Sequence, residues 1–152
     1  MIWVLLVVLA LIAGAAYLVL TFVVKGKQSQ GTDEVRETLG ADNILVLDDK
    51  AICKGTESGR YNNLVGMGTL ALTKDEFYFL RWSPRAELRI PRSDMLEHTF
   101  TIEHLDKGGK KPWLQVRYRN PEYTEGDEAG VDVVAWDVDD PDAFNDALKA
   151  QA

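Results

Sequence analysis

The sequence predicts a mainly β fold in which an N-terminal transmembrane helix precedes a seven-stranded bent sheet, or partly open barrel, capped by a C-terminal helix. Three observations lead to this prediction. An uncharged apolar run fills the first 24 residues, short apolar stretches bounded by turn residues follow Asp42, and helical spacing returns near the C-terminus. We therefore expect an anchor at 1–24, a tether at 25–41 and a β domain at 42–152.

The anchor is the run Ile2–Val24, IWVLLVVLALIAGAAYLVLTFVV, which contains no charged residue. As a helix it would be about 35 Å long, which is enough to cross the apolar core of a bilayer. The alternative is a secretory signal peptide cut near Ala13–Ala16, which would give an exported domain. Such a peptide carries a basic segment before its apolar run, and none precedes this one. We therefore favour an uncleaved, single-pass anchor.

The residues that flank the anchor predict its orientation. Lys25 and Lys27 follow the apolar run directly, and no basic residue precedes it. Because basic residues beside a membrane helix favour the cytoplasmic face, we expect a cytoplasmic domain attached to the inner (cytoplasmic) membrane. The next segment, KGKQSQGTDEV, is polar and contains glycines, which is typical of a flexible tether. Within it, Thr32 or Asp33 is expected to cap a short helix that ends at Leu39.

Beyond Asp42, alternating apolar residues predict an antiparallel β domain. The strands are expected near Ala51–Gly55, Gly68–Thr73, Phe77–Trp82, Glu87–Pro91, Leu96–Leu105, Trp113–Arg119 and Val131–Val138. The alternation also predicts which side chains face the core, because successive residues of a strand point to opposite faces. The predicted inward residues are Leu70, Leu72, Leu114, Val116, Tyr118, Val134, Trp136 and Val138.

The C-terminal segment predicts a helix with a well-defined start. Asp140 stands at the N-cap position and Pro141 at the first helical position. Phe144, Ala147 and Leu148 then form an apolar stripe that has to be buried against the sheet. Seven strands followed by one helix is the element order of the pleckstrin-homology (PH) superfold, in which the helix plugs one open end of a bent sheet.

Three segments carry a family resemblance that covers about Lys50 to Lys149. The block GMGTLALTKDEFYFLRWSPRAELRIPRSDM (Gly66 to Met95) resembles the GRAM and bacterial PH-like pattern of a glycine-led strand, an aromatic-rich strand and a strand ending in Ile-Pro. The later segments WLQVRYR and VVAWDVDDPDAFNDAL are similar to the last two strands and closing helix of that group. The resemblance to these bacterial membrane-anchored proteins, whose function is uncharacterised, implies a binding or scaffolding module and not an enzyme.

Composition narrows the classes of function. The net charge is −7 and every charged residue lies at or beyond Lys25, which argues against a nucleic-acid partner. Cys53 is the only cysteine, so a disulfide framework is excluded. His98 and His104 share a face of the fifth predicted strand and lack ligands at metal-site spacing, so we expect partly buried or rim histidines and neither metal nor cofactor. No nucleophile elbow, phosphate loop or catalytic triad is recognisable, so no catalytic residue is predicted.

Two sets of residues are candidates for binding. Arg60 and Tyr61 lie in the long loop Gly55–Gly68, and Arg85 lies in a turn expected at the same open end of the sheet; these three are candidates for contact with a protein partner. The second set, in and beside a Gly-Gly turn, consists of candidates for anionic-lipid headgroup contact: Lys107, Lys110, Lys111 and Arg117. Each basic residue near an anionic surface contributes about 1 kcal/mol, but a solvated face is the alternative because acidic residues interleave with them.

The distribution of acidic residues decides between these candidates. The stretch from Glu122 to Asp146 contains ten acidic residues and no basic one, so it either turns away from the membrane or binds a basic partner. Because the anchor already supplies membrane proximity, the domain does not need strong lipid affinity of its own. We therefore expect a cytoplasmic protein-interaction or scaffolding module at the membrane. The alternative is an anionic-lipid headgroup-binding domain, and weak lipid contact is compatible with both.

Overall fold

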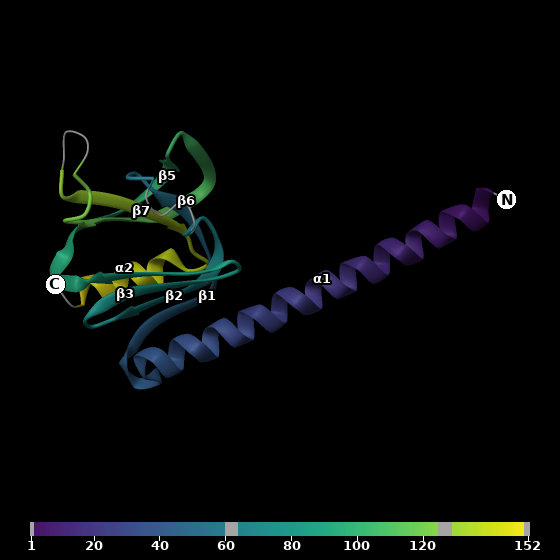
Figure 1. The fold of residues 1–152 in the computed structure, drawn as a ribbon, viewed down its shortest axis with the longest axis horizontal. Helices are drawn as coiled ribbons and strands as arrows, with labels where there is room; N and C mark the ends of the chain where they lie inside the picture. Colours follow the sequence, from purple (N-terminus) through teal and green to yellow (C-terminus); the bar gives the residue numbers. More distant parts are fainter. Residues whose placement is uncertain (1, 60–63, 125–128, 151–152) are drawn as a thin grey trace.

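The computed structural model describes residues 2–59, 64–124 and 129–150. It contains a long N-terminal helix, a curled antiparallel sheet of seven strands and a C-terminal helix, so the predicted fold class is confirmed (Figure 1). The helices and strands are α1 (Ile2–Leu39), β1 (Ile44–Thr56), β2 (Gly66–Thr73), β3 (Glu76–Trp82), β4 (Arg85–Pro91), β5 (Met95–His104), β6 (Lys107–Arg119), β7 (Val131–Asp137) and α2 (Pro141–Lys149), with single 3-10 turns at Ala41–Asn43 and Arg92–Asp94.

The strand order in the sheet is β4-β3-β2-β1-β7-β6-β5, and β1 joins its two halves. The first part of β1 pairs with β2, and its last part, from Ile52 to Thr56, pairs with β7. The register shifts between Cys53 and Gly55, and Gly55 has a φ of 107°, a backbone conformation that favours glycine. This bulge bends the sheet, so that it curls around α2 (Figure 1).

The main core fills the concave side of the curled sheet. All eight residues predicted to point inward are buried. Trp136 lies at its centre, stacked against Phe77 with ring centroids 6.0 Å apart. The helix α2 contributes Phe144 and Leu148, both buried. Its predicted N-cap is confirmed, since the Asp140 carboxylate accepts a hydrogen bond from the Ala143 amide at 3.0 Å.

Strand β1 starts seven residues earlier than predicted, at Ile44 instead of Ala51. The sequence Asp48-Asp49-Lys50 is typical of a turn, but here it forms a bulge inside the strand. Asp48 is buried and accepts hydrogen bonds from the amides of Lys50 (2.9 Å) and Asp139 (2.6 Å). These bonds satisfy the carboxylate, so the chain keeps its extended course through the acidic residues.

The largest difference from the prediction lies in residues 25–31, which are helical and not a flexible tether; the short helix predicted from Thr32 or Asp33 to Leu39 is found as the end of α1. Helix α1 continues from the apolar run to Leu39 without a break (Figure 1). Gly31, which favours a tether in the sequence, is a site of close approach: a Cβ atom there would lie 2.5 Å from Trp82 Nε1. The glycine therefore lets the helix lie against the sheet.

A second, smaller core lies on the convex side of the sheet, beneath the C-terminal part of α1. Val35 of α1 is buried there with Ala71 of β2 and with Tyr78 and Leu80 of β3. These side chains point away from the main core because they alternate with its members along the strands. The end of α1 is thus part of the β domain, and the domain has a fixed orientation relative to the helix.

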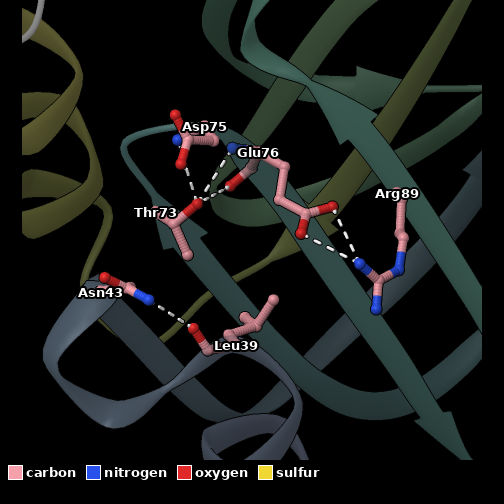
Figure 2. Close-up of polar contacts among 6 residues, drawn as sticks. All are labelled: Leu39, Asn43, Thr73, Asp75, Glu76 and Arg89. Carbon is pink, nitrogen blue, oxygen red and sulfur yellow. Dashed lines mark hydrogen bonds and ion pairs between the residues drawn. The ribbon is translucent and has the colours of Figure 1, made fainter.

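The helix ends where the sequence predicts, at Leu39 before Gly40, whose φ is 77°. Figure 2 shows this region: Asn43 Nδ2 donates a hydrogen bond to the Leu39 carbonyl at 2.8 Å. Nearby, the Thr73 hydroxyl accepts from the amides of Asp75 and Glu76 and fixes the turn between β2 and β3. At its other end, α1 is exposed over its whole apolar length and is long and apolar enough to cross a membrane.

Candidate interaction surfaces

Arg85, a predicted partner-binding residue, forms ion pairs with other residues of this chain. Its guanidinium contacts the carboxylates of Glu34 on α1 and Glu87 on β4. The pKa of Arg85 lies above its ordinary value. The main cause is the hydrogen bond to Glu34, and the negative charges of Glu34 and Glu87 add to it. Arg85 therefore attaches the β3–β4 turn to α1, which makes it a structural contact of the helix.

A small depression lies where α1 meets this turn. It has a volume of about 140 Å³ and is lined by Lys27 and Gln30 of α1 together with Arg81 and Trp82 of β3, among others. The Trp82 indole N–H donates to the hydroxyl of Thr69 at 3.0 Å, which fixes its ring over Gly31. The depression is thus the seam between helix and sheet, and its size suits water better than an organic ligand.

Arg60 and Tyr61, the other predicted partner-binding residues, lie outside the described residues. The start of their loop is held by Asp132, a buried carboxylate of β7. Asp132 accepts hydrogen bonds from the Ser58 amide (3.0 Å), the Ser58 hydroxyl (2.7 Å), the Tyr118 hydroxyl (3.2 Å) and Asn120 Nδ2 (3.2 Å). Sequence analysis did not single out Asp132, although it shares the strand face of Val134 and Trp136, which the alternation predicts to point inward.

The four predicted lipid-contact residues do not form one cluster. Lys107 and Lys110 are exposed at the start of β6. Lys111 instead points to β7, where Nζ lies 2.9 Å from Asp137 Oδ1 and donates to the Val138 carbonyl at 3.2 Å. Its hydrogen bond to Asp137 raises the pKa of Lys111. Arg117 lies ten residues further along β6 than Lys107, and their partners on β5, Glu97 and His104, are seven residues apart, about 23 Å in an extended strand.

The two histidines have different environments. His104 is buried at the end of β5, where Nε2 lies 3.0 Å from the Gly55 carbonyl oxygen and Nδ1 lies 3.1 Å from Gln115 Nε2. His98 is half-buried on the same strand. The partly buried histidines expected from the sequence are therefore found, with His104 more deeply buried than predicted. His104 joins the end of β5 to the bend of β1.

Cys53 is buried in the main core. Burial raises the pKa of its thiol to about 11, because the thiolate would lose its hydration. Reaction of this cysteine with electrophiles is expected to be slow, since the thiolate is the reactive form. Within residues 2–59, 64–124 and 129–150, no group of three or more His, Cys, Asp or Glu side chains is placed to hold a metal ion.

Strand β5 forms one edge of the sheet. In the described part of the chain, β6 pairs with one side of β5 and no strand pairs with the other. The register with β6 is regular from Glu97 to Thr101 and shifts on either side of this stretch. A shallow depression of about 90 Å³ lies alongside, on the outer face, and is lined by Glu57, Glu97, Thr99, Gln115, Arg117 and Val133.

Comparison with known proteins finds a likeness among solved structures. No protein-family model and no curated protein sequence matches this chain. Among solved structures, a chain of "The 8S snRNP Assembly Intermediate" is similar, with a TM-score of 0.50 and 12% sequence identity over 72% of this chain and 81% of that chain. At this identity the likeness concerns the fold alone. The resemblance to bacterial PH-like, GRAM-related proteins stays a prediction.

Proposed function

We propose that this chain is a single-pass membrane protein whose β domain binds a partner protein at the cytoplasmic face, and that it is a binding module and not an enzyme. The observation that carries the proposal is the exposed edge of β5, beside a depression with charged side chains. Helix α1 supports it, because a domain fixed to an apolar helix presents this edge at a constant position near the membrane.

An exposed edge strand binds extended segments through its backbone. The outward N–H and C=O groups of β5 have no strand partner among the described residues, and such groups pair readily with an added strand. The regular stretch Glu97–Thr101 is long enough for several such hydrogen bonds. The register shifts that flank it limit pairing to this stretch, since a bulge interrupts the ladder.

Charge favours a basic partner segment. Side chains of an added strand alternate between the two faces, so every second one would lie over the outer depression. That depression contains two carboxylates, Glu57 and Glu97, and one guanidinium, Arg117. The chain as a whole carries a net charge of −7, so long-range attraction also favours a basic partner.

The proposal is tested by photo-crosslinking from β5 in the full-length protein in its native membrane. A photoreactive phenylalanine analogue at Thr99 should capture a specific partner, and the same analogue at Asp146 of α2 should not. Adding Glu97→Lys should weaken capture because it places a positive charge on the edge and in the depression. The matched control, Asp146→Lys, makes the same charge change on an exposed residue of α2 and should leave capture unchanged.

Equal capture from both positions, or capture that Glu97→Lys does not alter, would contradict the role of β5. The cytoplasmic orientation has a separate test, because Lys25 and Lys27 are its only support. Protease added to intact spheroplasts should leave the β domain uncut, and lysis should expose it. Cleavage before lysis would establish the exported alternative.

The alternative function, recognition of an anionic headgroup, finds less support in the geometry. A headgroup site needs several basic side chains that converge on one phosphate, as in other anion-binding sites. Lys111 is bound to Asp137, and Arg117 is far from Lys107 and Lys110 along β6. The remaining two lysines are suited to weak, non-specific attraction to an anionic surface.

A further inference from the structure

The turn between β5 and β6 contains a leucine at a position where the backbone conformation of the turn favours asparagine or glycine. Leu105 and Asp106 connect the two strands and have φ values of 51° and 58°. Two-residue hairpin turns with positive φ at both positions strongly prefer Asn-Gly, and a bulky side chain is unfavourable there. Leu105 is nevertheless 40% exposed, so burial within the chain accounts for only part of its presence.

Other exposed apolar side chains lie beside Leu105. Val65, in the segment before β2, is 37% exposed. Both side chains lie against Gly55: a Cβ atom on that glycine would be 3.2 Å from Val65 Cγ2 and 3.4 Å from Leu105 Cδ1. Ile102, three residues before Leu105 on the same hairpin, is 56% exposed. We call these three exposed apolar residues, two of them together against Gly55 and one on the same hairpin, the hairpin tip.

The charged residues around the hairpin tip are mixed but include unpaired cations at its rim. Glu103 and Asp106 are acidic, while Lys107 and Lys110 are basic and exposed, with no ion pair to any described residue. Long lysine side chains can extend beside an inserted apolar residue and keep their ammonium groups among lipid phosphates. An apolar tip with exposed lysines beside it is suited to contact with a membrane interface.

The β domain begins a short distance beyond the end of the apolar run. The run ends at Val24, and the first buried residue of α1 is Gly31, so six residues, Lys25 to Gln30, separate them. In a helix these six residues span about 9 Å, comparable to the depth of the headgroup layer. In Figure 1 the β5–β6 hairpin lies on the side of the β domain from which α1 extends toward its N-terminus, and the C-terminus lies on the opposite side.

From these observations we infer that the hairpin tip, Val65, Ile102 and Leu105, rests in the headgroup region of the same bilayer that α1 crosses. The inference relies on the proposed membrane anchoring of α1. The domain then touches the membrane at two places, the helix and the hairpin tip, which together set its tilt. The contact is mainly apolar, and Lys107 and Lys110 add attraction to anionic lipid. The β5 edge stays free for a partner.

The test uses the full chain in bilayer nanodiscs of phosphatidylcholine and phosphatidylglycerol, with a fluorescent label on a single introduced cysteine. Cys53 stays unlabelled because it is buried and its thiol has a raised pKa. Gly108→Cys reports on the hairpin, since a Cβ atom there meets no side chain within 4 Å and its φ is not positive. Leu11→Cys reports on the anchor, and Lys149→Cys, near the C-terminus, reports on the opposite side of the domain.

Nitroxide-bearing lipid should quench the labels at positions 11 and 108 several-fold more strongly than the label at position 149. Adding Leu105→Asn should reduce quenching at 108 to the level at 149. In detergent the same substitution should not lower the unfolding temperature, because asparagine tolerates a positive φ.

Three other outcomes would each contradict either the hairpin contact or the anchoring of α1. Quenching at 11 with none above background at 108 would overturn the hairpin contact and leave the anchor in place. Absence of quenching at 11 would overturn the anchoring of α1, and the hairpin contact with it. Quenching at 108 that persists with Leu105→Asn would show that the hairpin tip does not make the contact.

Discussion

Asp132 shows how a single buried carboxylate connects distant segments. It lies at the start of β7 and accepts hydrogen bonds from Ser58, which begins the β1–β2 connection, and from Tyr118 and Asn120 at the end of β6. Hydrogen bonds to a charged group contribute about 1.5–3 kcal/mol each after the exchange with water, and the cost of burying the carboxylate offsets part of their sum. The carboxylate thus fixes the beginning of the loop that contains Arg60 and Tyr61.

We expect Asp132→Ala to lower the free energy of unfolding by about 3 kcal/mol, because it removes the common acceptor of five hydrogen bonds, one of them from the adjacent Val133 amide. The control, Ser58→Ala, removes only the hydroxyl donor and should lower it by about 1 kcal/mol. Urea unfolding of the full chain in detergent, followed by tryptophan fluorescence, measures both. Equal losses for the two variants would show that Asp132 does not join the segments.

Asp48 predicts a specific dependence on pH. Burial raises its pKa above the ordinary 3.8, although backbone hydrogen bonds from Asp139 and Lys50 oppose the rise. The folded chain therefore binds a proton more tightly at this position than the unfolded chain. By linkage, the contribution of Asp48 to stability falls as pH rises through the interval between the unfolded and folded pKa values.

The difference in unfolding free energy between the natural chain and Asp48→Asn isolates this contribution. We expect this difference to decrease as pH rises from about 4 to about 7, because only the natural chain titrates at this position. Asparagine also loses one of the two backbone bonds, since its amide has a single acceptor oxygen; that loss is independent of pH. A difference that increases with pH would mean that the folded-state pKa is lowered.

At the scale of elements, sequence periodicity predicts those strands and helices that bury one face against the main core. All seven strands and α2 occur in the predicted order, because each buries one face against the main core, although β1 and β6 begin earlier than predicted, at Ile44 and Lys107. The helical course of residues 25–31, which joins the apolar run to the predicted short helix, was not predictable in this way. It depends on the convex face of β2 and β3, whose Ala71, Tyr78 and Leu80 alternate with core residues and give no sign of their partner.

The candidate interaction surfaces also include features that the sequence predicts and features that depend on the tertiary structure. The sequence indicates basic residues, but whether a cation is free depends on acids from other strands, as Lys111 beside Asp137 and Arg85 beside Glu34 show. The exposed edge of β5 follows from the strand order, which is a property of the sheet. Leu105 was detectable in principle, because an apolar residue is unusual in a two-residue hairpin turn.

Two glycines of α1 are expected to respond in opposite ways to replacement by alanine. Alanine favours a helix over glycine by about 1 kcal/mol, so Gly26→Ala, where a Cβ atom meets nothing within 4 Å, should not destabilise the chain. Gly31→Ala places a Cβ atom 2.5 Å from Trp82 Nε1 and should lower the unfolding free energy by about 1–2 kcal/mol despite the better helix former. Denaturant unfolding in detergent compares them. Equal stability of the two variants would mean that α1 does not pack on the sheet in solution.

At the scale of the whole molecule, the proposed membrane anchoring makes α1 a continuous helical spacer between bilayer and domain. An α-helix advances 1.5 Å and turns 100° per residue. Inserting seven helix-forming residues between Lys25 and Gly26 therefore raises the domain by about 10 Å and changes its rotation by only about 20°. Inserting one residue turns the domain by about 100° around the helix axis and raises it by about 1.5 Å.

These two insertions separate height from rotation as the origin of the hairpin contact. If α1 crosses the bilayer close to its normal, turning the domain about the helix axis leaves the hairpin tip at the same depth, so the one-residue insertion should preserve lipid quenching of a label at Gly108→Cys. The seven-residue insertion should abolish it, because a rise of about 10 Å exceeds the depth of the headgroup layer. Quenching that survives the seven-residue insertion would mean that residues 25–30 bend at the membrane, and that the continuous helix does not set the position of the domain.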